Sequence, residues 1–255
     1  MNQTYRKENQ KFLPVLPLKN LVALPKSIIP VVVGRKISIK ALEFAIKHDK
    51  EIFVTAQKAI DIEVPKGDDL FHYGTRAVVL QMARMPNGAY KILVEGISRA
   101  HIENIEEHDG FLAGVSQDLQ AFPLEENSEN KAIWRNLFEL FKEYVSLNEK
   151  VSADVLGMFR GLQDLDHLTD TIAVQIPLDF GQRQSLLELV DLKQRALKLS
   201  VLLKKEIEVL NAEKNSRKRD QRQIETDIVR FEYAGHLAYR HVPFSAFREF
   251  SAFKC

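Results

Sequence analysis

Residues 74–100 read GTRAVVLQMARMPNGAYKILVEGISRA, and this stretch decides the fold. Two β-rich runs, residues 77–85 and 89–95, flank the tripeptide Pro86-Asn87-Gly88. Proline fixes φ at the entry to a turn, and Asn-Gly tolerates the positive φ that a tight hairpin demands. Both faces of the predicted hairpin carry apolar residues, so we expect a sheet that is covered on both faces or closed into a barrel.

The bulk composition sets limits on the kind of protein. The chain has 255 residues, 45% hydrophobic and 28% charged, which is ordinary for one large or two smaller domains. A net charge of +1 gives no global reason to expect a nucleic acid or an anionic membrane as partner. The single cysteine, Cys255, excludes a disulfide framework, and no run approaches the ~18 apolar residues of a membrane span. We therefore expect a cytoplasmic protein with no membrane partner.

The region before and after the hairpin is also β-rich. Residues 1–11 are polar and are expected to be disordered, and four prolines then divide residues 12–34 into short strands and turns. Ser38 is a candidate N-cap for a short helix. The candidate strands are residues 15–18, 29–33, 51–57, 101–105 and 111–119. Residues 12–122 are thus predicted to form a barrel-like β subdomain with one helix.

The periodicity changes after residue 123. Apolar residues recur every three or four positions over 128–147, which predicts an amphipathic helix. Ser152, Asp164 and Asp191 are candidate N-caps for further helices, residues 182–190 form another, and the helix after Asp191 is predicted to run to Leu210. The predicted fold class is α+β, with residues 123–210 forming a helical bundle that ends in a long helix.

Residues 211–255 differ in character from the helices before them. Residues 166–210 contain eleven leucines, whereas 211–255 contain only Leu237. We therefore expect the long helix to end near Leu210 and an atypical basic and aromatic tail to follow.

Several of these motifs together resemble the N-terminal region of the ATP-dependent protease Lon. The similar segments are LPVLPLKNLVALPKSIIPVVVGRKISIKALE, EIFVTAQK, DDLFHYGT, MPNG, LVEGISRAHI and IPLDFGQRQSLLELVDLKQRALKLSVLLKKEIEVL. The resemblance covers residues 12–210, and it ends where the family continues into an ATPase module and a serine-lysine protease module. On this basis we expect a truncated or frame-altered product of such a gene, or a fragment with a foreign end.

The resemblance implies a non-catalytic role for this chain. It implies recognition of unfolded or damaged protein substrates in quality control, and support of a hexameric ring. No GxxxxGK[ST] phosphate-binding loop and no match to the family's catalytic-serine segment occurs in the sequence. ATP, magnesium and proteolysis therefore belong to modules outside this sequence, and we expect no cofactor here. The seven histidines lack zinc-site spacing.

Six apolar residues are candidate substrate contacts, because a proline-bounded loop and flexible methionines suit varied partners. They are Leu24, Ile28, Ile29, Pro30, Met82 and Met85. The competing interpretation is that they are ordinary core residues. Two other classes of function stay open: a nucleic-acid module that uses the barrel and the basic residues Lys214, Arg217, Lys218, Arg219 and Arg222, and an enzyme whose activity resides in this chain.

Overall fold

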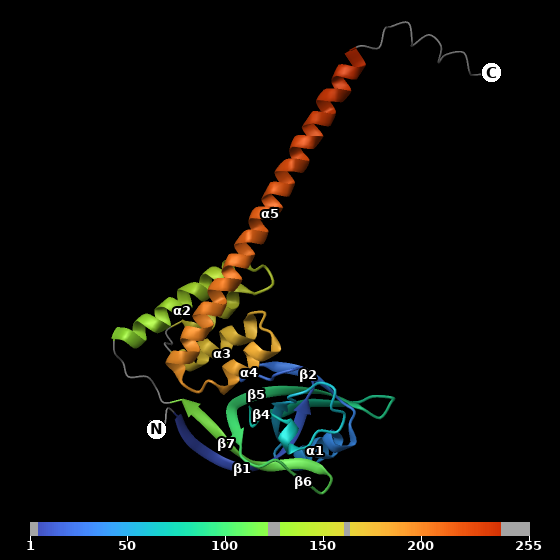
Figure 1. Cartoon of the computed structure of the whole chain (residues 1–255), viewed down its shortest axis with the longest axis vertical. Helices are drawn as coiled ribbons and strands as arrows, with labels where there is room; N and C mark the ends of the chain where they lie inside the picture. Colours follow the sequence, from blue (N-terminus) through green and yellow to red (C-terminus); the bar gives the residue numbers. More distant parts are fainter. Residues whose placement is uncertain (1–4, 122–127, 161–163, 241–255) are drawn as a thin grey trace, which may run out of the picture. The chain divides into compact units, whose positions relative to one another are not determined.

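The computed structural model describes residues 5–121, 128–160 and 164–240 (Figure 1). The chain divides into two compact units, the first ending at Glu206 and the second beginning at Ile207, and each is described by itself. The strands are β1 (Tyr5–Leu18), β2 (Ile28–Val33), β3 (Glu51–Ala56), β4 (Tyr73–Arg84), β5 (Tyr90–Ile102), β6 (Glu106–His108) and β7 (Phe111–Ala121). The helices are α1 (Lys36–Lys47), α2 (Ser128–Leu147), α3 (Leu165–Gln175), α4 (Phe180–Glu188) and α5 (Leu192–Arg240), with 3₁₀ turns at Gly67–Asp69 and Ala153–Phe159.

The predicted hairpin is formed by β4 and β5. Its turn is closed by the Met85 amide, which donates to the Ala89 carbonyl at 2.8 Å, and by the Gly88 amide, which donates to the Met85 carbonyl at 3.0 Å. Gly88 has φ of +83°, the left-handed region that glycine adopts without steric cost. The Asn87 side chain accepts from the Ala89 amide at 3.2 Å. The turn residues therefore act locally, as the sequence predicts.

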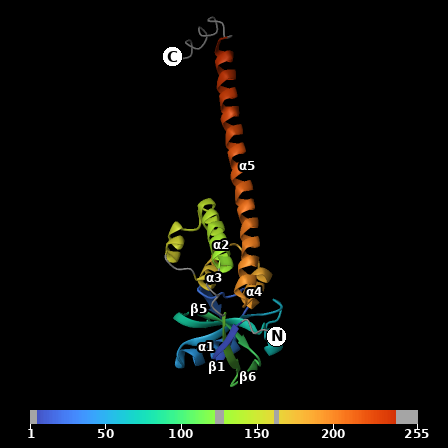
Figure 2. The ribbon, with the colours of Figure 1, turned by 90° about the vertical axis from the view of Figure 1, so that its left-hand side faces the viewer.

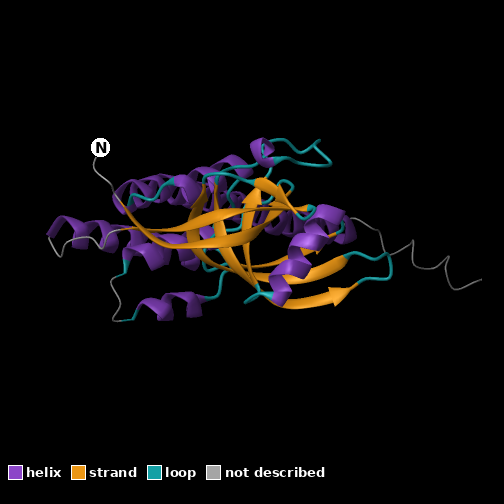
Figure 3. Ribbon diagram, turned by 90° about the horizontal axis from the view of Figure 1, so that it is seen from below, coloured by secondary structure: helices purple, strands orange, loops and turns teal. Residues whose placement is uncertain are grey.

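The sheet closes on itself because β5 is long enough to serve two neighbours. Its first half pairs with β2 and its last residues, Ala100 to Ile102, pair with β7, so the strands β5, β4, β3, β1 and β7 form a ring. Figure 3 shows the strands curving around a common interior. The carboxylate of Asp118 on β7, only 2% exposed, accepts from Arg76 on β4 at 2.9 Å and from Ser98 on β5 at 3.0 Å. This closure confirms the predicted barrel-like subdomain.

The barrel interior is an apolar core to which α1 contributes. Leu16, Val31, Val54, Val79 and Ile92 belong to one buried cluster, and Leu42 and Ala45 of α1 pack into it. The helix begins at Lys36, two residues before the predicted N-cap Ser38, which lies buried in the first turn. The prediction was wrong here because β2 ends at Val33 and the chain enters the helix almost at once.

The N-terminal strand also differs from the prediction. Residues 5–11, expected to be disordered, lie in β1 and pair with β7, from Tyr5 opposite Ala121 to Lys11 opposite Ser116. β1 then continues without a break through Pro14 and Pro17 to Leu18. A polar segment is ordered here because long-range strand pairing supplies hydrogen bonds that local sequence does not reveal. Residues 1–4 lie outside the described part of the chain.

The helices follow the predicted pattern up to residue 206, except that Ser152 caps a 3₁₀ turn, Ala153–Phe159, where a further helix was predicted. The helix α2 has the predicted bounds, and the Asp164 carboxylate caps α3 by accepting from the amides of Asp166 and His167. The Asp191 carboxylate accepts from the Gln194 amide at 2.9 Å, and Asp179, three residues upstream of the predicted start, caps α4. Figure 2 shows α3 and α4 beside the strands. The fold class is therefore confirmed.

The predicted end of the long helix at Leu210 is wrong. The helix α5 continues to Arg240, and its described side chains from Asn211 to Thr226 are exposed. Residues 211–226 contain neither proline nor glycine and are rich in Glu, Lys, Arg and Gln, which are good helix formers. The loss of leucines marks the loss of a packing partner, not the end of the helix. Residues 241–255 lie outside the described part.

Candidate functional site

An apolar stripe lies on the outward side of β2. Side chains alternate between the two faces of a strand, so Val31 and Val33 point into the core while Ile28, Pro30 and Val32 point outward. Ile28 is 55% exposed and Val32 is 63% exposed. We call Ile28, Pro30 and Val32 the outer stripe. Its partner strand β5 places the half-buried Leu93 opposite Pro30.

The strand β2 is also an edge strand, because among the described strands it pairs with β5 alone. An edge offers backbone groups to a further strand, and proline is one of the devices that limit such pairing. Pro30 lies in the middle of this edge. The outer stripe therefore combines exposed apolar side chains with a partly blocked backbone edge, an arrangement suited to weak and adaptable contacts.

The six candidate contact residues predicted from sequence do not all lie at the surface. Ile28, Pro30 and Met82 are exposed, and Met85 is partly exposed near the hairpin turn. Ile29 is half-buried and packs against the core. Leu24 is only 1% exposed, so the structure removes it from any accessible surface.

The loop that contains Leu24 is held against β5. The Lys26 amide donates to the Gly96 carbonyl, and the Gly96 amide donates to the Ser27 carbonyl, both at 2.9 Å. A Cβ at Gly96 would clash with the carbonyl oxygen of Leu24. The proline-bounded loop is thus tied down and is not a free apolar segment.

Two exposed residues were missed by the sequence reasoning. Val32 is more exposed than Ile28, and Leu80 on β4 is 42% exposed at a register irregularity between Val79 and Gln81. Side chains alternate along the strand IIPVVV, so Val32 is predicted to face outward as soon as one residue of the strand is known to face the core. The irregularity at Leu80 depends on strand pairing and has no local sequence signal.

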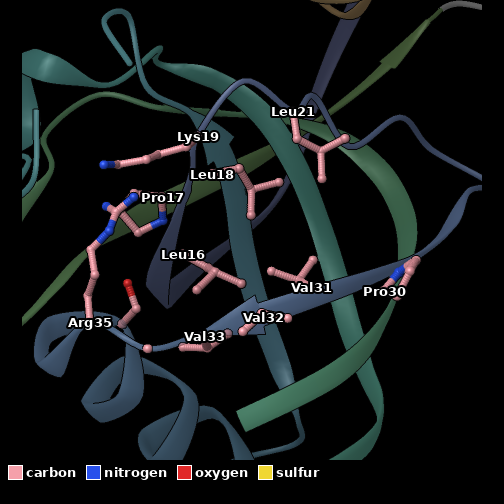
Figure 4. Close-up of a pocket in the computed structure, with 12 residues that line it drawn as sticks. Leu16, Pro17, Leu18, Lys19, Leu21, Pro30, Val31, Val32, Val33 and Arg35 are labelled. Carbon is pink, nitrogen blue, oxygen red and sulfur yellow. The ribbon is translucent and has the colours of Figure 1, made fainter. Parts of the chain in front are cut away.

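A groove of about 370 Å³ runs between β2 and the end of β1 (Figure 4). Leu16, Leu18 and Leu21 lie on one side of the groove and Val31 and Val33 on the other, and of these five only Leu21 is more than marginally exposed. The cations Lys19 and Arg35 lie toward one end of the view and Pro30 toward the other. The groove therefore has a small apolar rim, formed by Leu21, Pro30 and Val32, and a cationic end.

The cationic end already interacts with nearby polar groups. Lys19 Nζ lies 2.6 Å from the Glu63 carboxylate, and this hydrogen bond, followed by the charge of Lys19, lowers the pKa of Glu63. Arg35 donates through Nη2 to the Gln57 side chain at 2.6 Å. Burial lowers the pKa of Arg35, partly offset by the charge of Glu63. Arg35 Nη1 has no hydrogen-bond partner among the described residues.

A buried ion cluster joins the barrel to the helices within the first unit. Arg99 of β5 and Arg195 of α5 meet Asp166 and Asp170 of α3, and Arg195 hydrogen-bonds to Asp166. Burial lowers the pKa of Arg195 to about 10, and the charge of Arg99 acts in the same direction, whereas both aspartates raise it. Each charge in the cluster faces an opposite one, as expected for a cluster that stabilises the fold, and none of the four residues lines the groove.

The basic residues proposed for nucleic-acid contact lie on α5 in the second unit. Lys214, Arg217, Lys218, Arg219 and Arg222 are all exposed. Lys214, Lys218 and Arg222 follow one another at four-residue spacing and so share a helix face. The acidic residues Glu213, Asp220 and Glu225 are interspersed among them and dilute the positive field.

Within the described residues, no three His, Cys, Asp or Glu side chains are arranged to hold a metal ion. None of the helices in that part of the chain combines the length and the apolar character needed to cross a bilayer. The outer stripe and the groove present apolar side chains and two cations. Such groups can bind and orient a partner.

Comparison with known proteins assigns the family. Residues 12–205 match the model of the ATP-dependent protease La (LON) substrate-binding domain. The chain is 37% identical over 213 residues to the Lon protease of Escherichia coli strain K12 and 40% identical over 213 residues to that of Xanthomonas oryzae pv. oryzae. The chain therefore belongs to the Lon substrate-binding domain family.

The matches concern one part of the relatives. They include 84% of this chain but only 27% of the Escherichia coli protein and 25% of the Xanthomonas oryzae protein. Among solved structures, the N-terminal domain of the Mycobacterium avium complex Lon protease superposes with a TM-score of 0.59 at 22% identity, over 76% of this chain and 98% of that domain. At this identity the likeness supports the fold alone.

Proposed function

We propose that residues 12–210 recognise unfolded or damaged protein substrates for a cytoplasmic Lon-type protease, and that the outer stripe is the contact surface. The observation that carries this proposal is the row of three outward-facing apolar residues, Ile28, Pro30 and Val32, on an edge strand that pairs with β5 alone among the described strands. An unfolded chain exposes apolar segments that a folded protein buries, so an apolar surface discriminates between them.

The expected binding is weak and tolerant of sequence. Burial of apolar surface contributes about 25 cal/mol per Å², and most of this gain is offset by the ordering of a flexible partner. Weak binding suits quality control, because a partner must be released as well as captured. In the longer relatives, ATP hydrolysis, magnesium binding and peptide-bond cleavage would belong to other modules, and this region would also help to support a hexameric ring.

The test compares one protein in two states. A permanently unfolded variant of a small protein and its folded parent are titrated against the purified chain, and we expect measurable binding of the unfolded form alone. Val32→Glu should weaken that binding by about tenfold, because a charge is placed in the apolar contact. Equal binding of both forms, or of neither, would contradict the proposal.

Val115→Glu is the matched control. Val115 lies on β7 and is 51% exposed, so it matches Val32 in residue type and strand environment but lies outside the outer stripe. The control variant should bind the unfolded protein as the unsubstituted chain does. A similar loss in both variants would indicate a general effect of charge and not a contact at β2.

A further inference from the structure

The groove between β1 and β2 lies between two strand edges that face no other described strand. β7 pairs with β1 from Tyr5 to Pro14, and the following residues, Val15 to Leu18, pair with β3 on their other side. Across the groove, β2 pairs with β5 alone. A peptide that adds to a sheet in extended conformation uses such edges, with backbone hydrogen bonds for affinity and side-chain pockets for selectivity.

The groove can select for sequence through its two chemically different parts. Leu16, Leu18, Val31 and Val33 are buried core residues beneath the groove, so its accessible apolar surface comes from the half-buried Leu21 and from the exposed Pro30 and Val32 of the outer stripe. Pro17 and Pro30 have no N–H group, so each edge lacks one backbone donor and the pairing along it is incomplete. Apolar contact and a further anchor must therefore supply much of the affinity.

The cationic end provides that anchor. Arg35 Nη1 is buried at this end of the groove and has no hydrogen-bond partner among the described residues, while Nη2 donates to Gln57. A carboxylate that entered here would supply the partner that Nη1 lacks. Lys19 lies at the same end of the groove and already binds a carboxylate, that of Glu63, at 2.6 Å. The charge of the groove end is thus complementary to an acidic group.

The chain itself carries a segment with the expected chemistry. Residues 60–64 read IDIEV, an alternation of apolar and acidic side chains, and Ile60 and Val64 are 61% and 72% exposed. The acidic member, Glu63, reaches Lys19 and is itself 80% exposed. A carboxylate that arrives with a partner would compete with Glu63 for the same cation.

We propose that this groove binds an extended peptide segment in which an apolar stretch is followed by a carboxylate side chain, and that Arg35 and Lys19 bind the carboxylate while Glu63 competes with it. The inference rests on the proposed function and adds a selectivity to it. Acidic flanks would distinguish substrate segments that share the same apolar content.

The experiment uses the full chain and two fluorescent peptides of eight residues. Both contain the same apolar stretch, and they differ only in one flanking residue, Asp in the first and Asn in the second. We expect the Asp peptide to bind about tenfold more tightly, as a charge-assisted hydrogen bond predicts. Arg35→Gln should lower the affinity for the Asp peptide to that for the Asn peptide and leave the affinity for the Asn peptide unchanged. Glu63→Gln should strengthen the Asp peptide severalfold.

Two further variants keep the result interpretable. Arg35→Lys retains the charge and should retain most of the preference, and Lys19→Gln tests the same end of the groove if Arg35→Gln fails to fold. Equal affinity for the two peptides while unfolded protein still binds would overturn the groove proposal and leave the proposed function intact. Absence of all binding would overturn both.

Other occupants of the groove are distinguishable in the same experiment. Self-association of the chain that is abolished by Arg35→Gln, with no peptide preference, would assign the groove to a second copy and overturn the proposal. Arg35-dependent binding of an oligonucleotide in place of the acidic peptide would overturn it in favour of a phosphate ligand. A preference for the Asp peptide that persists in both Arg35→Gln and Lys19→Gln would place the anionic contact elsewhere and also overturn it.

Discussion

Arg99 of β5 and Asp170 of α3 form a buried ion pair in which Nη2 of Arg99 lies 2.5 Å from Oδ1 of Asp170. Each side chain is only 4% exposed. The two residues are far apart in sequence, and their pairing fixes α3 against the barrel. Because a buried charge is costly unless it is paired, the contact favours one arrangement of these elements over others.

Removal of Asp170 tests this relationship. Asp170→Ala leaves Arg99 and Arg195 close together without the aspartate that both face. We expect a loss of about 3 to 5 kcal/mol in the free energy of unfolding, since a buried charge then lacks its partner. Urea denaturation measures the loss. Asp61→Ala, at an exposed loop position, is the control and should change stability by less than about 0.5 kcal/mol. Equal effects would show that the buried pair has no special weight.

The pKa of Asp49 tests whether the N-terminal segment is ordered. Lys11 of β1 lies 2.9 Å from the Asp49 carboxylate, and that hydrogen bond, followed by the charge of Lys11, lowers the pKa of Asp49. The hydrogen bond to Asp49 also raises the pKa of Lys11. In Lys11→Met, NMR titration should find the pKa of Asp49 higher than in the unsubstituted chain. An unchanged pKa would mean that residues 5–11 do not hold this position.

The sign of the pH dependence follows from these shifts. The folded pKa of Asp49 is lowered, so its contribution to stability is present above the unfolded value and is lost as pH falls through the lowered pKa. The folded pKa of Lys11 is raised, so its contribution is present below 10.5 and is lost as pH rises through the raised pKa. Stability supplied by this pair should therefore be greatest between the two ranges, and Lys11→Met should remove that dependence.

Substitution of Gly96 tests the close approach between β5 and the Leu24 loop. In Gly96→Ala the new Cβ would clash with the Leu24 carbonyl oxygen, and backbone cannot move aside as a flexible side chain can. We expect a loss of about 1 to 3 kcal/mol in thermal or urea unfolding, as for other overpacked sites. Gly157→Ala is the control, because no atom lies within 4 Å of a Cβ built there. A neutral Gly96→Ala would contradict the tight contact.

A proline at Ser216 tests the continuity of α5. Ser216 lies in the helical stretch that the sequence analysis assigned to a tail, and its side chain is exposed. Ser216→Pro removes a backbone hydrogen bond and should lower the far-ultraviolet circular dichroism at 222 nm and the hydrogen-exchange protection of nearby amides. Ser216→Ala should retain or increase helicity. If residues 211–226 were not helical, both variants would have the same spectrum as the unsubstituted chain.

The nucleic-acid alternative depends on the same helix. If the five exposed cations on α5 bind phosphates, the affinity for a nucleic acid should fall steeply as the salt concentration rises. We expect a shallow slope, because three acidic residues are interspersed among the cations. This slope is measured by a fluorescence titration of an oligonucleotide at salt concentrations from about 50 to about 200 mM, because phosphate contacts weaken strongly over that range. A steep slope that decreases in Lys218→Gln would favour the alternative.

The surface residues were only partly predictable. The hydrophobic pattern of β2 identified a strand, but all six of its residues are apolar, so the pattern did not say which face was buried. Register against β5 places Pro30 and Val32 outward and Val31 inward. Leu24 is equally apolar in sequence, yet the hydrogen bonds between its loop and β5 place it in the core.

The sequence by itself determined the features that depend on local backbone chemistry. The Asn87-Gly88 turn, the Asp164 cap and the bounds of α2 follow from φ preference, side-chain capping and apolar spacing over a few residues. Three features depend on tertiary structure alone. They are the strand conformation of residues 5–11, the exposure of some but not all of the six candidate contact residues, and the pairing of Arg99 with Asp170. These depend on strand pairing and burial between segments far apart in the chain, and local sequence does not encode which distant partner will satisfy a backbone or a charge.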